Sequence, residues 1–215
     1  MDVVYVADQG SVRFEQDRCA VDIVCVGDSI TGWNNYGPRQ LWPYPTYPQF
    51  FQDFCVPLNL RVADGGIAGE ISDNGPEHVR RYLDLFPNSR YFIIGFGTND
   101  LGMWPDLETT SRQIIENLDS MVRAVREKEK RPMLFNVPHA NESMFGPRMA
   151  QDTHARRDYH NRRLEEFCAA NAIPLADICS RLKDEHLGDE LHPNKAGARI
   201  IAERVFETFA SVRTE

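Results

Sequence analysis

The segment VDIVCVGDSIT, residues 21–31, decides the fold. Its apolar run, Ile23 to Val26, is rich in β-branched residues, as is typical of a parallel strand buried on both faces. Gly27 then permits a tight turn at the carboxyl end of that strand, the edge where open parallel sheets bind their ligands. Ser29 follows the turn. Its position alone leaves two interpretations open, a nucleophile in a functional loop or the N-cap of a helix.

The rest of the chain alternates short apolar strands with amphipathic helices. Further strands are predicted over 60–63, 91–96, 133–137 and 173–176. Helices are predicted over 48–55, 77–85, 107–129 and 155–171, and after residue 194. This alternation predicts an α/β fold, a three-layer α/β/α sandwich on a five-stranded parallel sheet with right-handed crossovers. Residues 21–215 are expected to form one domain, preceded by an N-terminal extension, 1–20, that could be a β-hairpin.

Composition excludes several classes of protein. With 42% hydrophobic and 26% charged residues, the 215-residue chain has an ordinary globular composition, and its net charge of -8 argues against a nucleic-acid partner. It contains neither a membrane-spanning apolar run nor the pattern of a signal peptide, which predicts a cytoplasmic protein. Five cysteines without paired spacing indicate free thiols rather than a zinc site. No cofactor or metal is expected, and the oligomeric state is left open.

Polar residues gather at the predicted carboxyl edge of the sheet. Ser29 would be a nucleophile whose proton is taken by His192, because imidazole titrates near working pH. Asp189, three residues before His192, could orient the ring and stabilise the imidazolium. The oxyanion would need donors, and the candidates are the backbone N–H groups of Ser29 and Gly69 and the side-chain amide of Asn99. Together these residues predict an acyl-transfer site for a small-molecule ester.

Four short motifs, in this order along the chain, resemble the sequence blocks of the GDSL esterases, also called SGNH hydrolases. They are Gly27-Asp28-Ser29-Ile30, the glycine of Asp64-x-x-x-x-Gly69, Gly97-x-Asn99-Asp100 and Asp189-x-x-His192-Pro193. The resemblance implies a flavodoxin-like sandwich, a Ser–His–Asp triad without metal, and hydrolysis of esters or thioesters. It also implies that Asp28 supports the nucleophile loop. This chain has Asp64 where the family often has Asn, and Ile30 where Leu is commoner.

The resemblance leaves the substrate open among short acyl esters, acetylated carbohydrates, lysophospholipids and thioesters. Two other functions are weighed against it. A metal-dependent hydrolase would use Asp28, Asp100, Asp189 and His192. A non-catalytic carbohydrate-binding protein would use its tryptophans, and the aromatic side chains of the loop after Ser29 either line a ligand groove or pack that loop onto the domain. The candidate sugar-binding tryptophans are Trp33, Trp42 and Trp104.

The remaining histidines and a basic cluster are not expected to act in catalysis. His78 is expected to be solvated, and the other four histidines to be structural or solvent-facing. The arginines of the 155–171 helix are expected on its exposed face. The four histidines are His139, His154, His160 and His186, and the arginines are Arg156, Arg157, Arg162 and Arg163.

Overall fold

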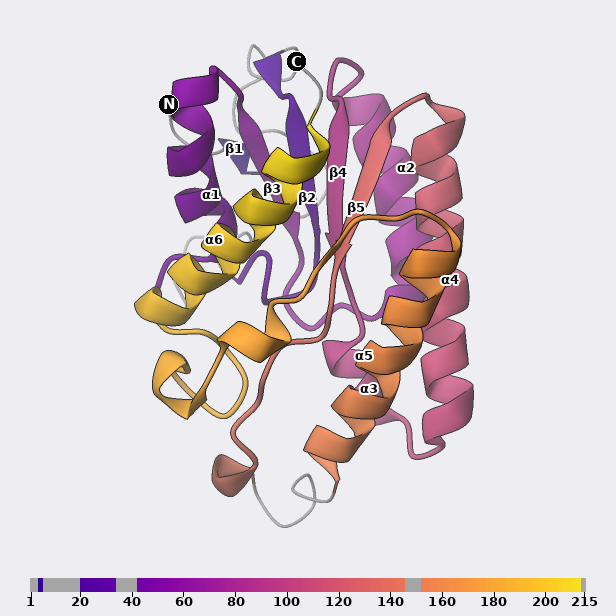
Figure 1. Ribbon diagram of the computed structural model, residues 1–215, viewed down its shortest axis with the longest axis vertical. Helices are drawn as coiled ribbons and strands as arrows, with labels where there is room; N and C mark the ends of the chain where they lie inside the picture. The colour runs from indigo at the N-terminus through magenta and orange to yellow at the C-terminus, as the bar shows by residue number, and fades with distance from the viewer. Residues whose placement is uncertain (1–3, 6–19, 34–41, 146–151, 214–215) are drawn as a thin grey trace.

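The computed structural model describes residues 4–5, 20–33, 42–145 and 152–213 (Figure 1). Its centre is a parallel sheet of six strands in the order β1-β3-β2-β4-β5-β6. The strands are β1 Val4–Tyr5, β2 Ile23–Gly27, β3 Val62–Gly66, β4 Tyr91–Gly95, β5 Arg131–Phe135 and β6 Leu175–Ala176. The order from β3 to β6 is that of flavodoxin-like folds, in which ligands bind where the chain reverses its direction of winding.

The five strands expected from the sequence are therefore confirmed, and a sixth extends the edge of the sheet. In β1, Val4 pairs with Ala63 and Tyr5 with Asp64, both in parallel. The start of the predicted N-terminal extension thus joins the main sheet. The rest of the predicted hairpin, 6–19, lies outside the described residues.

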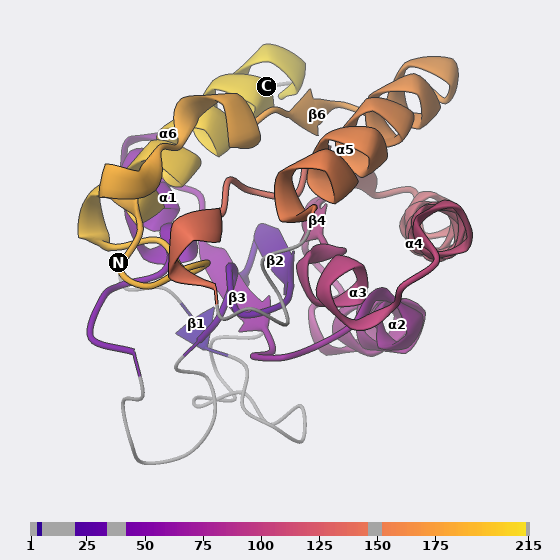
Figure 2. The same cartoon turned by 90° about the horizontal axis from the view of Figure 1, so that it is seen from below.

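Helices cover both faces of the sheet (Figure 2). The α-helices are α1 Tyr47–Cys55, α2 Gly75–Leu85, α3 Thr98–Met103, α4 Leu107–Glu127, α5 Thr153–Ala170 and α6 Lys195–Val212. Short 3-10 turns are η2 Val56–Leu58, η3 Ser72–Asn74, η4 Glu142–Met144, η5 Cys179–Arg181 and η6 Asp184–His186. Helices α1 and α6 pack together over one face, and α2, α4 and α5 cover the other. This arrangement confirms the predicted three-layer sandwich.

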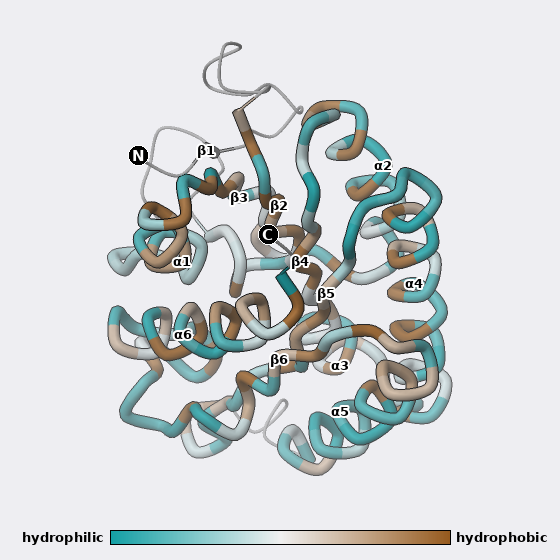
Figure 3. The backbone as a smooth tube through the Cα atoms, turned by 45° about the horizontal axis from the view of Figure 1, so that its top comes forward, coloured by the Kyte–Doolittle hydropathy of each residue, from teal (hydrophilic) through white to brown (hydrophobic). Residues whose placement is uncertain are grey.

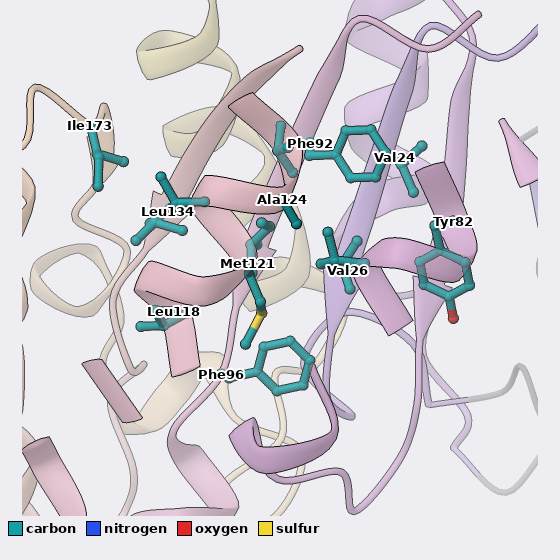
Figure 4. Packing of buried hydrophobic residues seen from close by; sticks show 14 of the residues in the cluster. Val24, Val26, Tyr82, Phe92, Phe96, Leu118, Met121, Ala124, Leu134 and Ile173 are labelled. Carbon is teal, nitrogen blue, oxygen red and sulfur yellow. The ribbon is translucent and has the colours of Figure 1, made fainter. Parts of the chain in front are cut away.

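Alternate side chains of the central strands supply two separate cores. Val24, Val26 and Phe92 face α2 and α4, where Met121 lies among them (Figure 4). Ile23 and its neighbours on the opposite face pack against α1 and α6. Burying an aliphatic or aromatic side chain of this size stabilises the fold by about 1.5–3 kcal/mol. The strands are accordingly apolar along most of their length, whereas the outer helix faces are hydrophilic (Figure 3).

Two local features differ from the sequence expectation. Strand β3 continues through Asp64-Gly65-Gly66, beyond residue 63, where the sequence predicts its end. A side chain at Gly66 would lie 2.1 Å from the backbone nitrogen of Gly32, so glycine is required where the loop after β2 crosses the strand end. The short helix α3 was not predicted, because six residues that include Gly102 carry no periodic apolar stripe.

Several polar side chains are more buried than predicted. His78 is half-buried beside Glu70 rather than solvated, and burial lowers its pKa. Arg157 is buried and pairs with Asp158, so the basic run on α5 is not an exposed face. Arg157 also lies 3.4 Å from Nδ1 of His139, a contact with a distant segment that helix periodicity cannot reveal. No helix in the described part of the chain is long and apolar enough to cross a membrane.

Candidate active site

Ser29 lies directly after β2, at the carboxyl edge of the sheet. Gly27, the last residue of β2, is in register with Gly66 of β3 and Gly95 of β4, so the loops after these three strands begin at one level. The turn is closed by backbone hydrogen bonds from Thr31 and Gly32 to the carbonyl of Asp28. Ser29 is 4% exposed. The structure therefore places Ser29 at the carboxyl edge of the sheet, as the sequence predicts.

His192 lies beside Ser29 although 163 residues separate them. The Ser29 hydroxyl is 2.9 Å from Nε2 of His192, and Nδ1 of the same ring is 2.8 Å from a carboxylate oxygen of Asp189. If Nδ1–H donates to Asp189, Nε2 is left to accept the serine proton. The three side chains thus form one continuous chain of hydrogen bonds.

The loop that carries His192 is held by local contacts. The other carboxylate oxygen of Asp189 accepts from the backbone N–H groups of Leu191 (2.8 Å) and His192 (2.6 Å). Burial raises the pKa of Asp189, but these hydrogen bonds and the imidazole outweigh it, so the pKa lies below its ordinary value. The Asn194 side chain caps α6 and also donates to the carbonyls of Glu185 and Leu187. Asp189 is therefore a carboxylate facing the ring at neutral pH.

Two tryptophans from the loop after Ser29 enclose the imidazole. The rings of Trp33 and His192 have centroids 4.1 Å apart, and those of Trp42 and His192 are 5.3 Å apart. The indole N–H of Trp42 donates to the carbonyl of Pro193. Trp104, which the sequence grouped with them, instead lines a cavity with Gly69 and Asn99. Trp33 and Trp42 thus pack onto the His192 segment.

Gly69 and Asn99, the candidate oxyanion donors besides Ser29, line a cavity whose described lining includes neither Trp33 nor Trp42. Gly69 has a φ of +78°, a conformation that favours glycine, and nothing lies within 4 Å of the position of an added side chain. No described residue accepts a hydrogen bond from the backbone N–H of Ser29 or Gly69. The Asn99 amide donates one hydrogen to the carbonyl of Glu70 at 2.7 Å, which fixes its orientation and leaves its second hydrogen to donate elsewhere.

Two buried carboxyl groups connect the loops that carry these donors. Asp28 accepts from the backbone N–H of Ile30 at 2.9 Å and from the Thr98 side chain. Burial, with a smaller contribution from nearby Asp100, raises the pKa of Asp28 to about 7. Asp100 accepts from the hydroxyl of Ser72 at 2.6 Å and from its backbone N–H, and burial raises its pKa as well. The sequence pointed to Asp28 as a support, but it gave no signal for Thr98 or Ser72.

The carboxylates proposed for a metal site are engaged in separate contacts. Asp189 binds the ring of His192, whereas Asp28 and Asp100 accept hydrogen bonds from backbone and hydroxyl donors. In the ranges that the structure describes, no three histidine, cysteine or carboxylate side chains are grouped so that they could hold a metal ion. Nothing in this geometry favours the metal-dependent alternative.

Other histidines have structural partners. His160 of α5 is fully buried, with Nδ1 3.0 Å from the hydroxyl of Ser111. Its burial, with a contribution from Arg163, lowers its pKa to about 4. His139 contacts Asp184 at 2.6 Å and stacks near His154. These contacts agree with the expectation of structural histidines.

An apolar cavity of about 540 Å³ opens beside Gly69 and Asn99. The C-terminal turn of α3 supplies Leu101, Met103 and Trp104 to its lining, and Leu191 adjoins it from the His192 loop. Because Ser29 contacts an imidazole and the neighbouring strand ends carry Gly69 and Asn99 at an apolar cavity, the arrangement suits nucleophilic attack on a carbonyl compound.

Comparisons with known proteins show the family and the fold of the chain. The model of the GDSL-like lipase/acylhydrolase family matches residues 25–200. A carbohydrate acetylesterase from Sinorhizobium meliloti is 13% identical with a TM-score of 0.73, covering 90% of this chain and all of the other. An acetylxylan esterase from Geobacillus stearothermophilus, solved as a catalytic mutant, is 17% identical with a TM-score of 0.69 over 92% of this chain and 98% of the other. A lipase/acylhydrolase from Enterococcus faecalis is 20% identical with a TM-score of 0.69, covering 89% and 96%. No curated protein matches at a significant level.

Proposed function

The chain belongs to the GDSL-like lipase/acylhydrolase family, and from this premise we propose that it cleaves carboxylic esters through Ser29, His192 and Asp189. The observation that carries the proposal is the pair of contacts that His192 makes, 2.9 Å to the serine hydroxyl and 2.8 Å to the carboxylate. A serine hydroxyl is a weak nucleophile until a base accepts its proton. These contacts would provide the base and keep its ring in the required tautomer.

In the first half of the reaction, the oxygen of Ser29 attacks the ester carbonyl carbon while its proton passes to Nε2 of His192. The carbonyl oxygen becomes negative and is stabilised by the N–H groups of Ser29 and Gly69 and by the amide of Asn99. His192 then gives the proton to the departing alcohol, which leaves an ester between the substrate's acyl group and Ser29. The lowered pKa of Asp189 supports its role, because an ionised carboxylate stabilises the transient imidazolium.

In the second half, water replaces the alcohol. His192 takes a proton from the water, whose oxygen attacks the acyl carbon, and the same ring returns a proton to Ser29 as the acid departs. Every proton transfer is thus carried by one imidazole. We assign the whole reaction to a single domain, 21–215, because the serine, the donors and the imidazole all come from within that range.

The substrates we propose are esters of short acyl groups, including O-acetyl groups on carbohydrate. The tryptophans beside His192 support a carbohydrate alcohol, because the leaving oxygen must lie near Nε2 and aromatic rings pack well against sugar rings. Two of the similar structures are named for acetyl esters of carbohydrate. Lysophospholipids and thioesters remain alternative substrates of the same chemistry.

The decisive experiment is replacement of the serine. Ser29→Ala is expected to abolish hydrolysis of p-nitrophenyl acetate and labelling by a fluorophosphonate, which reacts with activated serines. Ser143→Ala, on an exposed 3-10 turn, is the matched control and should keep both. The alternative of a non-catalytic carbohydrate-binding protein predicts that the native chain is neither labelled nor active. Undiminished activity of Ser29→Ala would refute the proposed role.

A further inference from the structure

Glu70 directly follows Gly69 and contacts the side chains of three other residues. Its backbone carbonyl accepts the hydrogen bond from the Asn99 amide at 2.7 Å. One oxygen of its carboxylate accepts from the amide of Asn74, and the other lies 3.8 Å from Nε2 of His78. Asn74 precedes α2 and His78 lies in it. Glu70 therefore connects a candidate oxyanion donor with the start of a helix.

The segment that carries Gly69 has little apolar anchoring of its own. Ala68 and Gly69 are exposed, and Ile67 and Ile71 are only partly buried. A backbone hydrogen bond from Glu70 to the carbonyl of Ile67 at 3.2 Å closes the turn. The side chain of Glu70, by contrast, is only 15% exposed. Its carboxylate thus connects this exposed turn to the body of the domain.

Helix α2 is a firm support for that carboxylate. The buried side chains of α2 pack against α4 in the core, and the hydroxyl of Tyr82 donates to the carbonyl of Gly65 in β3 at 2.9 Å. The side chain of Asn74 makes no capping hydrogen bond to α2, so its amide is available to Glu70. The positive end of the helix dipole also favours a carboxylate at this place.

The orientation of the Asn99 amide decides whether it can stabilise an oxyanion. A donor is most effective when it already points at the place where negative charge develops, because it then needs no reorganisation during the reaction. The carbonyl of Glu70 takes one of the two amide hydrogens and so sets the direction of the other. A misplacement of about 1 Å in such a contact can lower a rate on the order of 10²-fold.

We propose that Glu70 is a positioning residue for the proposed reaction: its carboxylate, held at the start of α2, fixes the carbonyl that orients the Asn99 amide and the backbone that presents Gly69. The inference rests on the proposed ester hydrolysis and adds a residue that lies outside the four sequence motifs. Glu70 itself does not contact the reacting atoms in this account. It acts through the two donors.

The first experiment compares two replacements of Glu70. Glu70→Ala should lower kcat for p-nitrophenyl acetate roughly 10- to 100-fold with little change in KM, because the donors act mainly on the developing charge. Glu70→Gln keeps an oxygen that can accept from Asn74 and should recover most of kcat. Glu77→Ala, at an exposed position of α2, is the matched control and should retain kcat. A kcat within about twofold of the native value in folded Glu70→Ala would overturn the inference.

The second experiment separates positioning from a purely structural role. If Glu70 acts through the Asn99 amide, the two residues belong to one network and their effects are not additive. The loss of kcat caused by Glu70→Ala should therefore be at least about threefold smaller in the Asn99→Ala background than in the native background. The measurement is a double-mutant cycle on kcat, with the unfolding midpoint of each variant. An equal loss in both backgrounds would show that Glu70 does not act through Asn99 and would overturn the inference.

Asn74→Ala provides an independent variant if Glu70→Ala does not fold. Asn74 is exposed and its side chain does not cap α2, so its replacement should be tolerated. Loss of this one hydrogen bond should lower kcat about three- to tenfold without raising KM. In that case an unchanged kcat of Asn74→Ala would contradict the assignment.

Failure of this inference is distinguishable from failure of the proposed function. In the first case, Glu70→Ala hydrolyses p-nitrophenyl acetate like the native chain, whereas Ser29→Ala is inactive and is not labelled by a fluorophosphonate. In the second case, Ser29→Ala retains the activity of the native chain.

Discussion

The candidate site has two parts of different origin. The imidazole of His192 and the carboxylate of Asp189 come from a single loop, whereas the donors of Ser29, Gly69 and Asn99 come from three loops. Asp189 and His192 are three residues apart, and the same loop supplies the hydrogen bonds that orient them. The donor side joins the ends of β2, β3 and β4 through contacts such as Asn99 to Glu70. The imidazole side is therefore specified locally, whereas the donor side depends on the whole sheet holding its register.

This difference predicts that the two sides respond differently to mutation. A change on the imidazole side removes one chemical step without disturbing the frame. A change on the donor side removes one of several hydrogen-bond donors, and the remaining donors still stabilise the negative charge. Three variants separate these cases, beginning with the largest expected effect.

Loss of the base should have the largest effect. His192→Gln keeps a side chain of similar length against Trp33 but cannot act as the base, so kcat should fall on the order of 10⁴–10⁶-fold. The measurement is steady-state hydrolysis of p-nitrophenyl acetate, together with the thermal unfolding midpoint. His186→Gln, in the preceding turn of the same segment, is the control and should retain activity. A fall of less than about tenfold for His192→Gln would remove the imidazole from the mechanism.

Loss of one donor should have an intermediate effect. Asn99→Ala should lower kcat by about 10²–10³-fold with little change in KM, because the missing hydrogen bond is made mainly to the developing negative charge. Asn117 is a useful control, since its amide also connects loops of this region through Ser72 and Asp73. Asn117→Ala should lower the unfolding midpoint and leave kcat nearly unchanged. Equal kcat losses in the two variants would indicate that Asn99 acts only as a structural tie.

The smallest effect concerns pH and stability. The pKa of Asp28 is about 7 in the folded protein against an ordinary 3.8, so the folded state binds the proton more tightly and loses stability as pH rises through this window. Asp28→Asn removes that loss, and its stability relative to the native chain should increase by about 2 kcal/mol between about pH 5 and pH 7. Urea unfolding at several pH values measures it.

His160 provides the opposite sign as a control. Its pKa is lowered to about 4 from 6.5, so the unfolded state binds the proton more tightly and the native chain loses stability as pH falls. His160→Gln should therefore gain relative stability toward acid, by about 2 kcal/mol over the same window. If the stability of both variants, relative to the native chain, changed in the same direction with pH, the assigned pKa shifts of Asp28 and His160 would be contradicted.

The sequence pointed to residues on both sides of the site for a physical reason. Apolar periodicity located the five strands and the long helices, and four ordered motifs identified Ser29, Asn99 and the Asp189–His192 pair. These signals are local in the chain. Which catalytic roles these residues perform is a proposal that the variants test.

What the sequence could not predict depends on contacts between distant segments. Arg156 looked like part of a solvated basic face, because its carbonyl partners at Leu101 and Trp104 are more than fifty residues away. The strand predicted over 60–63 ended before the glycines of β3, because glycine is disfavoured in strands unless another backbone approaches closely. Helix α3 was missed since a helix this short carries too few apolar positions to form a stripe.

The separation of Ser29 from His192 by 163 residues also has a consequence during synthesis. In a growing chain, Ser29 is synthesised long before His192. On the proposed mechanism, the hydroxyl has no base until α6 docks and fixes its preceding loop. Docking of the last helix would then be the event that completes the proposed site.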